Sequence, residues 1–260
     1  MRRTAFALAL VASASAARAQ HIGPRYTDPR SATVDAEGAR SIFVEARAGL
    51  LRIQGRSGIS SVRVTATAFA SRREWLDDIR LVARREGDEV RIVADVPEVH
   101  GPSFGDNARG LDLIIEVPNT IPLEVEDGSG EAEVRGVAEL EMTDGSGELT
   151  IDDIGGPVRV IDGSGELEIR NVRGDVWVRD GSGEIRIRDV TGSLVVDDDG
   201  SGEINADGIR GSVRVVEDGS GSIHVGDVGG DFIVEHDGSG SISFDNVKGS
   251  VRVPRRRGDS

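Results

Sequence analysis

An aspartate opens the sequence Asp-Gly-Ser-Gly seven times, at Asp127, Asp144, Asp162, Asp180, Asp199, Asp218 and Asp237. Acidic side chains at a repeated position could bind calcium between repeats, because calcium prefers carboxylate oxygens. The alternative is that each aspartate accepts a hydrogen bond within its own turn while the glycines supply positive φ angles. In water, unit charges about 4.8 Å apart repel by only about 1 kcal/mol, so the column is tolerable without metal. We therefore expect no cofactor and no metal ligand, with a calcium-dependent repeat as an alternative.

A second column of acidic residues follows the turns, and serines replace it in the last two repeats. Its members are Glu131, Glu148, Glu166, Glu184, Glu203, Ser222 and Ser241.

The serine of each Gly-Ser-Gly is the other group that could react, as a nucleophile. A serine nucleophile needs an adjacent base, and no histidine recurs at a matching position, since the four histidines are scattered. The repeats are also short and almost free of the insertions that build a catalytic cleft. We therefore predict that the chain is not an enzyme and assign no catalytic residue. Trp177 is the one outward aromatic that could stack on a sugar.

The spacing of the turns indicates the fold. The copies follow one another at 17, 18, 18, 19, 19 and 19 residues, a period typical of solenoids. In the copy 162–179, the apolar residues Leu167 and Ile169 alternate with charged ones, and Val176 and Val178 do so after a second turn. Alternation bounded by glycine and aspartate is typical of strands. Each repeat of about 18 residues thus has two short strands and two turns.

Two architectures fit this pattern, a parallel β-solenoid and an antiparallel meander, for which Asp-Gly is a hairpin signal. The second turn decides between them, because it keeps an apolar residue that a solenoid corner would bury. These residues are Ile154, Val172, Val190, Ile209, Val228 and Val247. We predict an all-β, parallel and right-handed solenoid, with inward residues extending to Ile242 and Phe244, and to Val251 and Val253, in the last repeat. One coil cannot fold alone, so neighbours must cover it.

The chain divides into five parts. Residues 1–19 have a basic start, an apolar run and an Ala-x-Ala site, as in a secretory signal peptide. Residues 20–38 are expected to be a linker, 39–126 an N-terminal β region that caps the solenoid, 127–253 the seven-repeat solenoid, and 254–260 a basic tail.

The N-terminal β region is expected to hold degenerate repeat strands, a helix and a hairpin. Ser71 and Glu74 match a capping box, so a short helix should begin there. The segments 79–83 and 89–93 should form a hairpin around Gly87, and 97–110 an irregular loop.

The net negative charge of the chain limits the kinds of partner that it can bind. The formal net charge is −15 and becomes −18 without the first 19 residues, which carry three arginines and no acid. Such a charge disfavours nucleic acid and anionic membranes. The absence of cysteine excludes disulfides and a lipid-anchored cysteine. No apolar run after the signal is long enough to span a membrane.

The repeated Gly-Ser-Gly-(Asp/Glu)-hydrophobic-x-hydrophobic, after the lead-in Val117 to Val125, resembles the bacterial family of exported β-strand-repeat proteins named putative adhesins. The resemblance covers roughly residues 40–253 and is strongest over 111–253. It implies a β-helical fold in an exported or envelope-associated protein, and it brings no catalytic residues.

These observations predict an exported, periplasmic or cell-surface interaction protein that presents a rigid acidic rod to a protein or envelope partner. A self-assembling structural scaffold is the alternative. Pro254 and the arginines after it disfavour open-ended stacking, so we expect a monomer.

Overall fold

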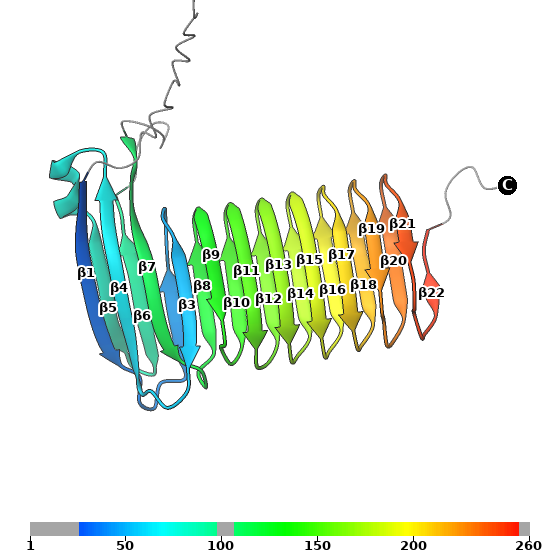
Figure 1. Cartoon of the computed structure of the whole chain (residues 1–260), viewed down its shortest axis with the longest axis horizontal. Helices are drawn as coiled ribbons and strands as arrows, with labels where there is room; N and C mark the ends of the chain where they lie inside the picture. The colour runs from blue at the N-terminus through cyan, green and yellow to red at the C-terminus, as the bar shows by residue number, and fades with distance from the viewer. Residues whose placement is uncertain (1–25, 98–106, 255–260) are drawn as a thin grey trace, which may run out of the picture.

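The computed structural model describes residues 26–97 and 107–254, which form two 11-stranded sheets that face each other along a rod (Figure 1). The first sheet consists, in spatial order, of β1 (Tyr26–Asp35), β4 (Ser61–Ala70), β7 (Arg109–Pro118), β3 (Leu51–Arg56), β9 (Gly130–Arg135), β11 (Gly147–Ile154), β13 (Gly165–Val172), β15 (Gly183–Val190), β17 (Ile204–Ile209), β19 (Ile223–Gly226) and β21 (Ile242–Phe244). The second sheet consists of β5 (Arg80–Glu86), β6 (Glu89–Asp95), β2 (Ser41–Glu45), β8 (Leu123–Asp127), β10 (Leu140–Asp144), β12 (Val158–Asp162), β14 (Val176–Asp180), β16 (Leu194–Asp199), β18 (Val213–Asp218), β20 (Phe232–Asp237) and β22 (Val251–Arg252).

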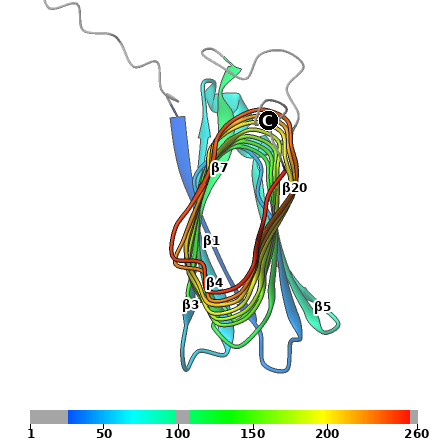
Figure 2. The same cartoon turned by 90° about the vertical axis from the view of Figure 1, so that its right-hand side faces the viewer.

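Each repeat forms one coil with a strand in each sheet, and equivalent strands of successive coils pair in parallel. The register is that of the sequence repeat, since Leu149 lies beside Leu167, and Val158 beside Val176. Alternate side chains of both sheets point inward and form one continuous apolar core. Viewed along the rod, the coils superimpose around this core (Figure 2). The predicted β-solenoid is confirmed.

The second turn of the coil also buries its apolar residue, as the solenoid prediction requires. Five of the six residues at this position are fully buried, and Val247 in the last coil packs against the core from a partly buried position. The buried ones are Ile154, Val172, Val190, Ile209 and Val228.

The last coil departs from the predicted inward pattern. Phe244 is 46% exposed and Val253 is 36% exposed, and Ile242 and Val251 are only partly buried. The reason is that no described strand pairs with the outer edges of β21 and β22, so this coil has a neighbour on one side only.

The prediction of a linker over 20–38 is wrong for its described part. Tyr26–Asp35 is a full strand, β1, which pairs antiparallel with β4 from Tyr26↔Ala70 to Asp35↔Ser61. The strand lies at the edge of the sheet, a position in which a proline such as Pro29 is tolerated. An edge strand buries little, and only Val34 is buried here, so the apolar signal of a strand is missing from its sequence.

The helix and the hairpin of the N-terminal region are found, with one correction. The helix is a 3-10 helix, η1 (Arg73–Asp78), with Arg72 at its N-cap and no side-chain cap, so the capping box is wrong. Leu76 of the helix is buried. The hairpin is β5–β6, which turns at Gly87. Of the loop expected over 97–110, residues 98–106 lie outside the described residues, and 109–110 begin β7.

The N-terminal region covers the first Asp-Gly-Ser-Gly coil, as predicted, and does so with a coil of its own. Strands β2 and β3 pair in parallel with β8 and β9. On their other side, β2 pairs with β6, and β3 with β7. Ala46, whose N–H donates to Glu126 O at 2.8 Å, stands where the next coil has Asp127. The segment 41–56 is thus a degenerate repeat with alanine in place of the aspartate.

The Asp-Gly-Ser-Gly turns stack directly on one another. The Gly165 N–H donates to Ser182 O at 2.9 Å. At Gly183 the φ angle is +144°, and a Cβ there would overlap the carbonyl oxygen of Gly165 in the adjacent coil. The second glycine of the turn is therefore required both by its conformation and by the close approach of two backbones.

Among the described residues, no helix has the length and hydropathy needed to cross a membrane. The predicted signal peptide over 1–19 lies outside the described residues, as does the basic tail beyond Pro254.

Candidate interaction surface

The aspartate column lies inside the solenoid, and the expectation that it stands in water is wrong. From Asp127 to Asp218 the six side chains are at most 7% exposed. Each ends a strand of the second sheet. The first four follow an inward valine or methionine by two residues, so strand alternation turns them inward. Asp199 and Asp218 follow one by three residues, and the register shift between β14 and β16 keeps them in the column. The expected turn hydrogen bond forms at Asp162, whose Oδ1 accepts from the Ser164 N–H at 3.2 Å. Elsewhere in the column, the buried carboxylate oxygens accept no hydrogen bond from the described residues.

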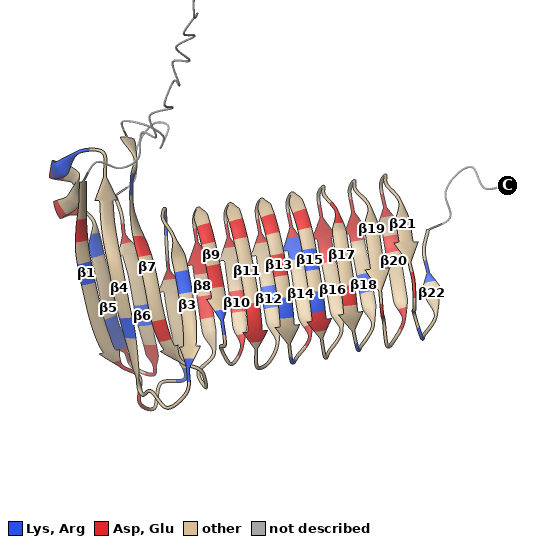
Figure 3. Cartoon of the chain, viewed as in Figure 1, with Lys and Arg blue, Asp and Glu red and all other residues tan. Residues whose placement is uncertain are grey.

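The glutamate column lies on the outer face of the first sheet, in register from coil to coil. Arginines from adjacent rows pair with it: Arg52 contacts Glu131 at 3.3 Å, and Arg186 pairs with both Glu166 and Glu184. Figure 3 shows red positions on successive strands of the rod, with blue positions on some of them. Two arginines therefore pair with three of the five glutamates, and among the described residues Glu148 and Glu203 have no ion pair.

A different row of side chains crosses the outer face of the second sheet. The parallel register places Phe43, Glu124, Glu141, Arg159 and Trp177 side by side on successive strands. Two glutamates thus lie between aromatic side chains, with Arg159 next to Trp177.

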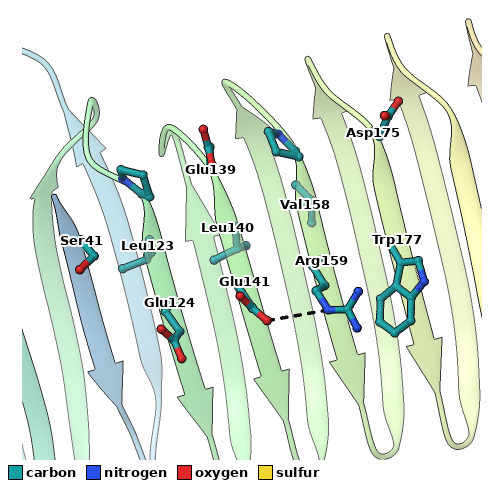
Figure 4. Close-up of a pocket in the computed structure, with 12 residues that line it drawn as sticks. Ser41, Leu123, Glu124, Glu139, Leu140, Glu141, Val158, Arg159, Asp175 and Trp177 are labelled. Carbon is teal, nitrogen blue, oxygen red and sulfur yellow. Dashed lines mark ion pairs between the residues drawn. The ribbon is translucent and has the colours of Figure 1, made fainter.

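A groove of about 380 Å³ lies along this row, beside the degenerate coil and the first three repeats (Figure 4). Apolar atoms form most of its wall, because the prolines and parts of the inward-facing aliphatic residues line the groove between the outward side chains. Four carboxylates and one guanidinium border it. The lining residues are Ser41, Pro122, Leu123, Glu124, Glu139, Leu140, Glu141, Pro157, Val158, Arg159, Asp175 and Trp177.

Trp177 is half-buried on the outward side of β14, as its sequence position predicted. The Arg159 guanidinium lies over its ring at 3.5 Å from the centroid, and the Arg179 guanidinium lies at 5.6 Å. Such stacking is attractive because the ring face is electron-rich. Since Arg159 occupies a ring face, Trp177 is better placed to fix the arginine than to stack on a sugar.

The groove is acidic. Burial raises the pKa of the Glu124 carboxyl above its ordinary value, and the nearby charges of Glu141, Glu126 and Glu89 raise it further. Among the described residues that line the groove, Arg159 is the one cation, and its Nε lies 3.8 Å from Glu141 Oε1. A cationic group entering between the glutamates would relieve this repulsion, so the groove suits a ligand with both basic and apolar groups.

The structure brings together three residues that sequence reasoning left apart. His224 Nδ1 lies 3.0 Å from Ser243 Oγ, and His224 Nε2 lies 3.8 Å from Asp245 Oδ1. The nineteen-residue register could have predicted the His224–Ser243 contact. A working triad needs its carboxylate hydrogen-bonded to the histidine and buried, whereas the Asp245 side chain is 69% exposed and beyond hydrogen-bond distance. This cluster therefore lacks the geometry of a nucleophile site.

Among the described residues, no group of three or more histidine, cysteine or acidic side chains has the arrangement of a metal site. The calcium alternative stays a prediction, which the experiments below address.

No family model and no curated protein matches this chain. Among solved structures, it is similar to a protein described as a putative cell adhesion protein from Clostridium sporogenes, at 14% identity and a TM-score of 0.40, over 89% of this chain and 100% of that one. It is also similar to one described as a putative lipid binding protein from Parabacteroides distasonis, at 15% identity and a TM-score of 0.45, over 88% and 97% of the two chains. At these values the likeness carries no argument about function.

Proposed function

We propose that this chain is an exported, non-enzymatic interaction protein of the cell envelope or surface, and that its rod binds a basic segment of a protein partner in the groove beside Trp177. The groove itself carries the proposal. It combines an apolar floor at Leu123 and Leu140 with carboxylates at its rim, and a rigid ladder of strands holds every lining side chain in place.

Rigidity matters because a preformed surface loses little conformational entropy on binding. Each lining residue belongs to a paired strand or to a turn that stacks on its neighbours. A basic peptide segment could place a cation between Glu124 and Glu141 and an apolar side chain on the floor. Salt should weaken such binding, because the rim carboxylates are exposed enough to be screened.

Photo-crosslinking in intact cells tests the groove. A photoreactive residue at position 141, inside the groove, is expected to give a discrete crosslinked product. The same residue at Thr150, which lies outward on the first sheet, is the matched control and should give none. Trp177→Ala should suppress the product from position 141 without lowering the melting temperature of the purified protein. A product of equal yield from both faces, or none from the groove, would refute the proposal.

Protease accessibility tests the location. If the protein is on the cell surface, protease digests it on intact cells, whereas a periplasmic protein is digested only after the outer membrane is opened. Protection under both conditions would contradict export.

End-to-end assembly is a second candidate function, and the exposed last coil favours it. Phe244 and Val253 present apolar surface next to the unpaired edges of β21 and β22, and free strand edges are templates for pairing. Sedimentation velocity over a wide concentration range distinguishes the two candidates, because assembly requires the particle to grow with concentration.

A further inference from the structure

The aspartate column forms an unbroken line inside the rod. The register pairs Asp127 with Asp144, Asp144 with Asp162, and so on through Asp218 and Asp237. Asp199, near the middle, has no exposed surface at all. At a strand spacing of about 4.8 Å, successive carboxylates are close enough to interact strongly once water is excluded.

These carboxylates are buried without partners, and this independently indicates a ligand. Both side-chain oxygens of five of them are inaccessible to solvent and accept no hydrogen bond from the described residues. Burying an ionised carboxylate in this way is strongly unfavourable, so the column must gain positive charge from somewhere. The five are Asp127, Asp144, Asp180, Asp199 and Asp218.

The described elements around the column supply no counter-charge. Opposite the column, the first sheet contributes inward aliphatic side chains such as Leu167 and Ile185, and the degenerate coil contributes Ala46. The groups that act on the carboxylates are turn amides and other aspartates, with no lysine, arginine or histidine among them. Charged neighbours on the same strands and on the strands after the turns lie outside the core. Asp197 and Asp198 before Asp199 are half-buried, and Asp197 pairs with Arg179. The others are Glu126, Glu217 and His236, and Glu131, Glu148, Glu166, Glu184 and Glu203.

Protons fit this site better than a metal ion does. The register places neighbouring aspartates beside one another at 127–144, 144–162, 199–218 and 218–237, where their charges repel, and a proton held between two such carboxyl groups would supply a hydrogen bond that neither carboxylate can donate. Burial and the adjacent carboxylates raise the pKa of Asp144 and of Asp199 to about 7. A calcium site needs six or more oxygens, and no described acidic group has a metal-binding arrangement.

We propose that the interior aspartate column is a proton-binding site, in which a carboxylic acid on one coil donates a hydrogen bond to the carboxylate of the next. Each shared proton neutralises one carboxylate of a neighbouring pair. Protonation removes the charge that cannot be buried and adds hydrogen bonds between coils. The site thus joins the repeats through their interior.

The proposal fixes the sign of the pH dependence. An unfolded chain releases these protons above its ordinary aspartate pKa near 3.8, whereas the folded rod holds them until about pH 6–7. Since the folded state binds more protons over that interval, the stability of the rod falls as the pH rises through it. Above the folded pKa the proton contribution is lost.

Urea unfolding of the full chain between pH 5 and pH 8 tests this. The unfolding midpoint should fall as the pH rises, and Asp199→Asn should flatten the fall, because an amide carries its own hydrogens at every pH. Glu217→Gln, one residue before Asp218 and pointing outward, is the matched control and should keep the wild-type slope. A midpoint independent of pH, or an equal slope in Asp199→Asn, would overturn the proposal.

Infrared spectroscopy gives a second readout that needs no variant to fold. At pH 6 the native protein should show the carbonyl stretch of protonated carboxyl groups, which urea unfolding at the same pH removes. Absence of that band refutes the proposal. Urea midpoints measured in EDTA and in millimolar calcium distinguish a column that binds protons from one that binds a metal ion. A midpoint that rises with calcium at pH 8, together with stoichiometric calcium binding, would show that the column holds cations in place of protons.

Discussion

Replacing Gly183 by alanine should destabilise the rod far more than the same change at an open turn. At Gly183 a side chain meets two obstacles, the φ angle of +144° and the backbone of Gly165 in the adjacent coil. A residue held in that region of backbone space costs on the order of 1–3 kcal/mol, and forcing an extra methyl into a close-packed site costs about 1–3 kcal/mol. Together they predict a loss of roughly 2–6 kcal/mol.

Gly87→Ala is the matched control. Gly87 also has a positive φ, +65°, but a Cβ there would have no atom within 4 Å. Only the conformational cost remains, about 1–2 kcal/mol. Both variants are measured by urea unfolding of the full chain, followed by circular dichroism. Melting temperature provides a check, since about 2–6 kcal/mol corresponds to a fall of roughly 4–24 °C in a chain of this size.

The relative stability of these two glycine variants tests how closely the turns are stacked. If Gly183→Ala loses no more stability than Gly87→Ala, the turns cannot be stacked as closely as the structure has them. The hydrogen bonds between turns, such as that from Gly183 N–H to Ser201 O at 2.9 Å, would then also be in doubt.

Three further outcomes follow from the core, an outer ion-pair cluster and the open end. Ile187→Ala removes a fully buried side chain and should cost about 2–5 kcal/mol, whereas Val195→Ala, outward on β16, should change the urea midpoint little. At Asp152, burial alone would raise the pKa, but hydrogen bonds from Asn171 and two arginines lower it below 3.8. Asp152→Asn should therefore cost about 1–3 kcal/mol at pH 7. The difference in urea midpoint between this variant and the wild type should vanish as the pH falls through the lowered pKa. Phe244→Asp should abolish any growth of the sedimenting particle with concentration, and unchanged growth would exclude the last coil as the assembly site.

The sequence predicted the solenoid because its signals repeat. Leu149 and Leu167 are equivalent in period, in alternation and in their distance from a turn, and the buried Val172 distinguishes a coil corner from a hairpin. The degenerate coil was harder to recognise, since Ala46 replaces the aspartate that marks every other copy. Strand β1 gives almost no apolar signal, because it lies at an edge.

The orientation of the aspartates was within reach of the sequence. Asp162 follows Val158 and Val160 at a spacing of two residues, which in a strand places all three on the inner face. The preference of Asp-Gly for turns instead favoured an aspartate exposed in a turn. That preference describes isolated turns, whereas here the strand continues up to and includes the aspartate. The groove beside Trp177 could not be predicted, since it depends on how Pro122 and Pro157 lie between neighbouring strands.

The placement of the degenerate coil has a consequence for the order of folding. Each repeat pairs with partners fewer than twenty residues away, whereas Leu51 must find Leu113 on one side and Ala132 on the other. Distant contacts form late because the chain between them must first be ordered. The repeats should therefore acquire structure first, and the segment 41–56 should enter last as a wedge between two preformed surfaces. Pulsed hydrogen exchange would show it as late protection of β2 and β3, although these strands precede every repeat in the sequence.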